Sequence, residues 1–185
     1  MTLHRVLLAD CPAQPWRNGG GITRELLAWP PGQADWQLRV SVARIDRDGP
    51  FSAFPGVRRC FAVAHGAGVT LDLARGRRAL TVDDDALEFD GEDAPECHLL
   101  EGPTEDINLM ARRDAGRPRL QRARPGSVIG GELRWRGLLA ASAVRLQIED
   151  RTEPLRAGTL VWSDSVDGAA WTLHDGALAW WLSLD

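Results

Sequence analysis

Apolar and polar residues alternate along much of the chain, most clearly in residues 35–45. In an extended strand, successive side chains point to opposite faces, so a period of two separates them into two rows. The apolar row consists of Trp36, Leu38, Val40 and Val42. The other row consists of Gln37, Arg39, Ser41 and Ala43. This segment is therefore predicted to be a β-strand with one buried face.

Similar short runs bounded by Gly, Pro or Asp recur along the whole chain and predict further strands. They cover residues 6–9, 23–29, 59–64, 69–73, 86–89, 98–100, 106–110, 138–140, 144–148, 159–162, 170–173 and 178–184. The best helix candidate is residues 133–141, although Gly137 interrupts it. The pattern predicts an all-β protein, a sandwich or barrel with little helix.

An arginine-rich segment with two prolines, residues 112–126, favours a link between two β units. We predict an N-terminal unit over residues 1–113 and a smaller C-terminal unit over residues 114–185, packed as one compact domain. The arginines are expected to be exposed or paired with the acidic stretch 83–96. The alternative, a nucleic-acid-binding arm, is not favoured by the formal net charge of −4, and we expect no nucleic-acid partner.

The composition narrows the class of protein further. No run of about eighteen apolar residues could cross a bilayer, and the apolar run near the N-terminus is too short for a signal peptide. The three cysteines fit neither a disulfide framework nor a zinc site. We therefore expect a cytoplasmic protein that does not enter a membrane. All 22 basic residues are arginine, so any anion must be held by guanidinium or backbone N–H groups.

Three further segments carry candidate chemistry. Residues 15–25, PWRNGGGITRE, contain three successive glycines that let backbone amides approach an anion, although the same glycines also fit a tight turn without a ligand. Residues 49–59, GPFSAFPGVRR, combine turn formers with two aromatic residues. Residues 102–113, GPTEDINLMARR, place Asp106, Asn108 and Met110 on one face of a strand.

These three segments and the strand WQLRVSVARI, taken in order, resemble the HutD/Ves family over approximately residues 13–113. The resemblance implies an all-β double cupin (bicupin) of barrel or jelly-roll architecture, which forms a homodimer. It also implies a link to histidine utilisation, in which the family acts as a modulator. The expected ligand is a small carboxylate metabolite of the urocanate or formylglutamate class.

Cupin enzymes that use a metal bring a His-x-His pair, a glutamate and a later histidine onto one ion. No two of the four histidines, His4, His65, His98 and His174, are separated by a single residue. Glu96 and His98 would supply two ligands at most. We therefore predict no metal, no cofactor and no catalytic residue. Metal-free acid/base chemistry by Glu25 or Asp106 remains the alternative, as in an isomerase or hydrolase acting on a related acid.

The family motifs supply a hypothesis for the ligand site. Arg39 would hold a carboxylate through two parallel hydrogen bonds, while polar side chains orient the ligand and aromatic ones form the walls. The predicted ligand-binding residues are Trp16, Asn18, Gly19, Gly20, Thr23, Glu25, Arg39, Ser41, Phe51, Phe54 and Arg58. Two alternatives remain open: Arg39 on an outer, solvated sheet face, and Glu25 as a counter-charge for an arginine. A structural partner protein without a ligand is a third possible function.

Overall fold

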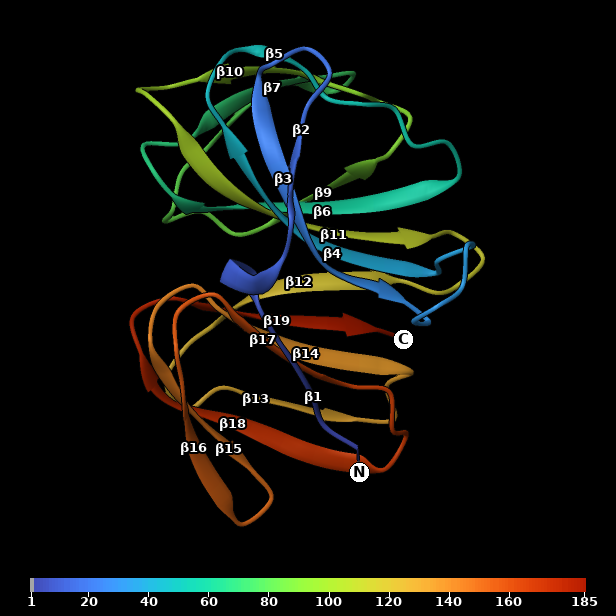
Figure 1. Ribbon diagram of the computed structural model, residues 1–185, viewed down its shortest axis with the longest axis vertical. Coiled ribbons are helices and arrows are strands. Elements are labelled where there is room, and N and C mark those ends of the chain that lie inside the picture. The colour runs from blue at the N-terminus through green and yellow to red at the C-terminus, as the bar shows by residue number, and fades with distance from the viewer. Residues whose placement is uncertain (1) are drawn as a thin grey trace. The chain divides into compact units, whose positions relative to one another are not determined.

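The computed structural model describes residues 2–185, which form two compact units (Figure 1). The N-terminal unit is Cys11–Arg117, and the C-terminal unit combines Pro118–Asp185 with the chain before Cys11. This division differs from the predicted one after residue 113. The start of the chain belongs to the C-terminal unit because β1, His4–Leu7, pairs with β17, Thr159–Ser163.

The N-terminal unit contains two antiparallel sheets. A six-stranded sheet has the order β2-β3-β4-β11-β6-β9, and a four-stranded sheet has the order β5-β10-β7-β8. The strands of the first are Ala13–Pro15, Gly21–Trp29, Leu38–Ile45, Thr104–Arg112, Val57–His65 and Leu87–Asp90, in that order. Those of the second are Gly49–Pro50, Glu96–Leu99, Val69–Leu73 and Gly76–Leu80. Buried apolar residues from both sheets, including Phe61, Leu71 and Cys97, form one core.

The C-terminal unit is also built from two sheets, with the orders β1-β17-β14-β19-β12 and β13-β18-β15-β16. The strands other than β1 and β17 are β12 Pro118–Ala123, β13 Val128–Gly131, β14 Trp135–Ala140, β15 Val144–Ile148, β16 Arg151–Leu155, β18 Gly168–Gly176 and β19 Ala179–Leu184. A 3-10 helix, Leu8–Asp10, follows β1. The core of this unit includes the buried side chains of Leu146, Trp171 and Trp181.

The all-β prediction is confirmed: residues 2–185 contain no α-helix, and so no helix that is long and apolar enough to cross a membrane. The proposed helix over residues 133–141 is wrong, because this segment contains β14. Every residue of β14 is buried, Arg136 included, so neither face of the strand is exposed and its burial shows no period of two. A side chain at Gly137 would have its Cβ 2.8 Å from the Trp135 ring and 3.0 Å from the Val161 carbonyl oxygen.

The segment predicted as a linker is partly regular structure. Its centre forms β12, which pairs with β19 and belongs to the C-terminal sheet. The predicted pairing with the acidic stretch is confirmed in the N-terminal unit, where Arg113 contacts Asp90 and an Arg117 nitrogen lies 3.3 Å from a Glu88 oxygen.

The alternation predicted for β4 is confirmed. Leu38 and Val40 are fully buried in the apolar row, whereas Arg39, Ser41 and Ala43 line a pocket. The strand register places Met110 of β11 opposite Arg39 and Asn108 opposite Ser41. The polar face of β4 is thus continued by β11 across the sheet.

Candidate functional site

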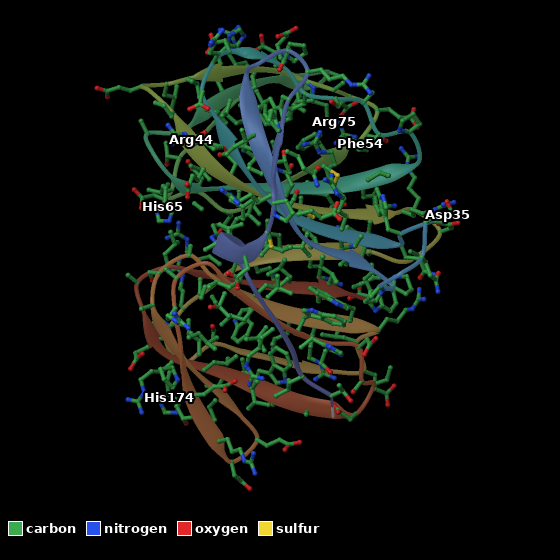
Figure 2. The ribbon with its side chains drawn as sticks, in the orientation of Figure 1. Asp35, Arg44, Phe54, His65, Arg75 and His174 are labelled. Atoms are coloured by element: carbon green, nitrogen blue, oxygen red, sulfur yellow. The ribbon has the colours of Figure 1, made fainter. Side chains whose placement is uncertain are left out.

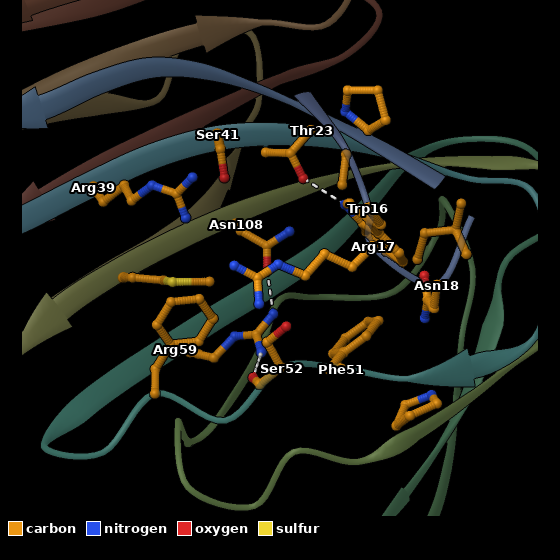
Figure 3. A pocket seen from close by; sticks show the side chains of 16 residues that line it. Trp16, Arg17, Asn18, Thr23, Arg39, Ser41, Phe51, Ser52, Arg59 and Asn108 are labelled. Atoms are coloured by element: carbon orange, nitrogen blue, oxygen red, sulfur yellow. Dashed lines mark hydrogen bonds between the residues drawn. The ribbon is translucent and has the colours of Figure 1, made fainter. Parts of the chain in front are cut away.

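The N-terminal unit contains a pocket of about 600 Å³, hereafter the N-terminal pocket (Figure 3). Its lining consists of Pro15, Trp16, Arg17, Asn18, Thr23, Arg39, Ser41, Ala43, Ile45, Pro50, Phe51, Ser52, Phe54, Arg59, Asn108 and Met110. Three arginines belong to this lining, and within residues 2–185 no aspartate, glutamate or histidine does. The pocket therefore presents hydrogen-bond donors and positive charge between apolar walls.

The floor of the N-terminal pocket is a face of the six-stranded sheet. In the pairing of β6 with β11, Arg59 lies opposite Met110, which in turn lies opposite Arg39 of β4. Because facing residues of paired strands point to the same side of a sheet, these side chains form one row across the floor. Asn108 and Ser41 belong to the next row. Residues far apart in the sequence therefore place their polar groups in one hollow.

Arg59 is the most deeply buried charged side chain of the pocket lining, with 4% of its surface exposed. Its Nη2 donates to Asn108 Oδ1 at 2.7 Å, and its Nη1 donates to the Ser52 carbonyl oxygen at 3.4 Å. Its Nε is buried without a hydrogen-bond partner. The guanidinium carbon also lies 4.9 Å, 5.7 Å and 5.1 Å from the ring centres of Phe51, Phe54 and Phe89 respectively. These rings support the cation through their π faces.

The surroundings of Arg59 disfavour its positive charge. Burial, and secondarily the positive charge of Arg39, lower the pKa of Arg59 to about 10. Among residues 2–185, no carboxylate forms an ion pair with Arg59. A buried guanidinium that meets only neutral acceptors and aromatic faces is electrostatically uncompensated. An anion in the N-terminal pocket would supply the missing charge.

Arg39 differs from Arg59 because it already has an acidic partner. Its Nε donates to Glu25 Oε2 at 2.6 Å, and 15% of the Arg39 side chain and 34% of the Glu25 side chain are exposed. Glu25 lies on β3 opposite Ser41 and is outside the pocket lining. The geometry matches the alternative in which Glu25 is a counter-charge for an arginine.

The glycine-rich loop at the edge of the pocket is a tight turn closed by its own hydrogen bonds. The Gly19 N–H donates to the Trp16 carbonyl oxygen and the Gly20 N–H donates to Asn18 Oδ1, each at 3.0 Å. Gly21 permits close contact with β4, because a Cβ there would lie 2.3 Å from the Arg44 carbonyl oxygen. The backbone amides expected to approach an anion are therefore used within the loop.

The structure brings most of the predicted ligand-binding residues to the N-terminal pocket. Those in its lining are Trp16, Asn18, Thr23, Arg39, Ser41, Phe51 and Phe54. Those outside it are Gly19, Gly20, Glu25 and Arg58. Trp16 is held in place by its indole N–H, which donates to Thr23 Oγ1 at 2.8 Å.

Arg58 occupies the opposite face of β6 from Arg59. It is exposed, and its Nη1 lies 3.4 Å from Glu88 Oε1. From Arg59 to Ala64 both faces of β6 are buried, so the period of two does not by itself show which of the two arginines faces the pocket. Other pocket residues that the sequence hypothesis missed include Arg17, Ser52 and Asn108.

The histidines lie outside the N-terminal pocket. Figure 2 shows His65 and His174 at the periphery of their units, and both are exposed. His98 lies between two carboxylates, 3.1 Å from Asp48 and 3.4 Å from Asp72, and its hydrogen bond to Asp48 is the main cause of its raised pKa. Within residues 2–185, no group of three or more His, Cys, Asp or Glu side chains is arranged to hold a metal ion.

Asp106 is a fully buried carboxyl beside the pocket floor. It lies opposite Ala43 in the sheet, two residues from Asn108, but it is not part of the lining. Burial raises the pKa of Asp106 to about 7, although the hydrogen bond that the Thr104 hydroxyl donates at 2.7 Å opposes this shift. Its Oδ1 has no hydrogen-bond partner. Asp106 is thus a buried carboxyl that can gain or lose a proton near neutral pH.

The fold resembles several solved structures. A conserved protein of unknown function from Pseudomonas aeruginosa PAO1 has a TM-score of 0.87 and 27% identity, with complete coverage of both chains. HutD from Pseudomonas fluorescens SBW25 has a TM-score of 0.86 and 24% identity over 99% of this chain and 98% of that one. A Bacillus subtilis oxalate decarboxylase variant has a TM-score of 0.63 and 10% identity over 97% and 76%. These likenesses confirm the expected double cupin fold.

Sequence comparison identifies the family. Protein Ves from Citrobacter koseri is 36% identical over 104 residues, 56% of this chain and 54% of that protein. An uncharacterized 21.2 kDa protein from the hutC 3' region of Pseudomonas putida is 36% identical over 113 residues, 60% of each chain. These matches span little more than half of the curated relatives. The HutD family profile, however, matches residues 8–180, so the chain belongs to the HutD family.

Proposed function

We propose that the protein binds a small carboxylate in the N-terminal pocket and that this binding modulates histidine utilisation. The observation that carries the proposal is Arg59, a buried guanidinium without an acidic partner among the described residues. Arg39 lies in the same row of the floor, and Asn108 and Ser41 supply neutral polar groups beside it. A carboxylate matches this set because guanidinium groups and carboxylates share a planar, bidentate hydrogen-bonding geometry.

The chemistry of the lining favours an anion over a metal ion as the bound species. Metal ions need carboxylate, imidazole or thiolate donors, whereas the pocket presents cations, an amide and hydroxyl groups. Apolar side chains of the lining, such as Phe51 and Phe54 in the walls and Met110 in the floor, lower the local dielectric and so strengthen the attraction between the arginines and an acid. Binding of this kind needs neither a cofactor nor a catalytic residue.

The pathway assignment in this proposal rests on the family and on the Pseudomonas putida relative described by its place in the hutC 3' region. Urocanate and formylglutamate, acids of histidine breakdown, are the candidate ligands. A binding protein can modulate a pathway when the ligand shifts its population between two states or assemblies. The proposed modulator acts in the cytoplasm as a homodimer.

A thermal and chemical unfolding screen tests the proposal. A ligand at one hundred times its Kd is expected to add about 2.7 kcal/mol to the free energy of unfolding. Urocanate and formylglutamate should stabilise the protein, and their uncharged amides should not. If neither acid stabilises it, carboxylate binding is contradicted. NMR spectra of each acid incubated with the protein provide the second test, since product formation would favour a metal-free enzyme over a binding protein.

The ion pair between Arg39 and Glu25 predicts opposite effects of two substitutions. Arg39→Gln should weaken carboxylate binding about tenfold, because it removes one charge-assisted hydrogen-bonding group from the floor. Glu25→Gln should leave binding unchanged or strengthen it, because Arg39 then has no competing carboxylate. Isothermal titration with the same acid measures both affinities. Equal weakening by the two substitutions would show that the ion pair acts as one structural unit.

A further inference from the structure

The positive charge around the N-terminal pocket exceeds what one carboxylate group would balance. Arg17, Arg39 and Arg59 line the pocket, and within residues 2–185 the lining contains no acidic side chain. Glu25, just outside the lining, pairs with Arg39 and balances its charge. The charges of Arg59 and Arg17 then remain uncompensated. A ligand that carries two negative charges would restore neutrality.

The two uncompensated guanidinium groups belong to different parts of the pocket. Arg59 rises from β6 and is almost completely buried, whereas Arg17 is an exposed residue of the loop between β2 and β3. In Figure 3 the Arg17 side chain extends from this loop over the hollow, toward the side where Asn108 and Arg59 lie. Burial, and secondarily the charge of Arg39, lower the pKa of Arg59, whereas the Arg17 side chain is exposed to solvent. One cation thus lies at the floor and another at the solvent-exposed side.

We propose that the ligand is a dicarboxylate and that Arg17 selects it by binding the second carboxylate. This inference rests on the proposed function, because it assumes that the first carboxylate binds at Arg59. The two charges of the ligand are then held at different depths of the pocket. The aliphatic part between them contacts apolar residues of the wall, such as Ile45 and Phe51. Arg17 is a specificity-determining residue.

Isothermal titration with succinate and butyrate tests this proposal, because the two acids have four carbons each and differ in one carboxylate. The wild type is expected to bind succinate about tenfold more tightly than butyrate, the effect of one partly exposed charge-assisted contact. Arg17→Gln should remove this preference by weakening succinate binding about tenfold, while butyrate affinity changes by less than about twofold. Arg75→Gln, which removes the same charge from an exposed position outside the pocket, should leave both affinities unchanged.

The other outcomes separate this inference from the proposed function. Equal binding of succinate and butyrate, or a preference that Arg17→Gln preserves, would overturn the dicarboxylate assignment and leave carboxylate binding in place. Absence of binding by both acids would overturn both proposals. Inorganic phosphate, titrated in parallel, should bind more weakly than succinate. Tighter binding of phosphate would show that one doubly charged group, rather than two separate carboxylates, fits the pocket.

Discussion

Arg59→Met is expected to weaken carboxylate binding strongly and, at the same time, to make the unliganded protein more stable. The substitution removes a buried charge whose pKa is lowered to about 10 by desolvation and by Arg39. A pKa reduction of this size corresponds to about 3 kcal/mol against the charged form. Methionine keeps much of the side-chain volume but loses the hydrogen bond to Asn108 and the contacts with the phenylalanine rings. We therefore expect a net stabilisation of about 1–3 kcal/mol.

The effect of the same substitution on binding should be larger. Truncation of one partner of a buried, hydrogen-bonded charge pair costs about 2–5 kcal/mol, which corresponds to a loss of affinity of about 30-fold or more. Urea denaturation without ligand and isothermal titration with succinate measure the two effects. Arg58→Met is the matched control, because Arg58 is the adjacent residue of β6 and its side chain is exposed on the other face of the sheet. A less stable Arg59→Met protein that still binds the acid would contradict the assigned role.

Asp106→Asn is expected to remove a pH dependence of stability that arises in the interior. Burial raises the pKa of Asp106 to about 7 from an ordinary value of 3.8. Below pH 3.8 the carboxyl is neutral in both the folded and the unfolded chain, so its burial does not make the free energy of unfolding depend on pH. As the pH rises toward 7, the unfolded chain ionises while the folded protein keeps the proton. Stability therefore falls over this interval, by about 4 kcal/mol in total, and becomes constant above it.

Urea denaturation of the wild type and the Asp106→Asn variant at several pH values between 4 and 8 tests this prediction. Asparagine has no proton to release, so the difference in stability between variant and wild type should increase toward pH 8 in favour of the variant. Glu101→Gln is the control, because Glu101 is an exposed carboxyl in the loop that precedes β11. A difference that stays constant with pH would show that Asp106 is ionised alike in both states.

Residue alternation was sufficient to predict many of the strands. β7, Val69–Leu73, and β15, Val144–Ile148, coincide with the predicted runs. The runs predict strands because a half-buried strand repeats its environment every second residue. Residues 138–140 of β14 were predicted as a strand, but the whole of β14 also lay within the helix candidate, because a strand buried on both faces leaves no alternation to detect. β12 was read as a linker because arginines and a proline conceal its pairing with β19.

The candidate site could be predicted only in part. The motifs indicated the loop at Trp16 and the polar row of β4, and both contribute residues to the lining of the N-terminal pocket. Arg58 was chosen in place of Arg59, a shift of one residue that changes the face of the strand. The role of Asn108 depends on its position opposite Ser41, and the pairing of β11 with β4 that sets this position cannot be predicted from the sequence alone. Gly19 and Gly20 carry a turn signal, but only the structure shows that their N–H groups are used within the loop.

By itself, the sequence determined the β class, the segments that carry polar groups and the family resemblance, because these depend on local periodicity and on motifs that neighbouring residues encode. Tertiary structure alone decided which arginine is buried without an acid, which one pairs with Glu25, and that Arg17 belongs to the same pocket lining as Arg59. These properties depend on the register between β3, β4, β11 and β6, which joins residues far apart in the chain. Burial and pairing, which set the cost of each charge, arise from that register.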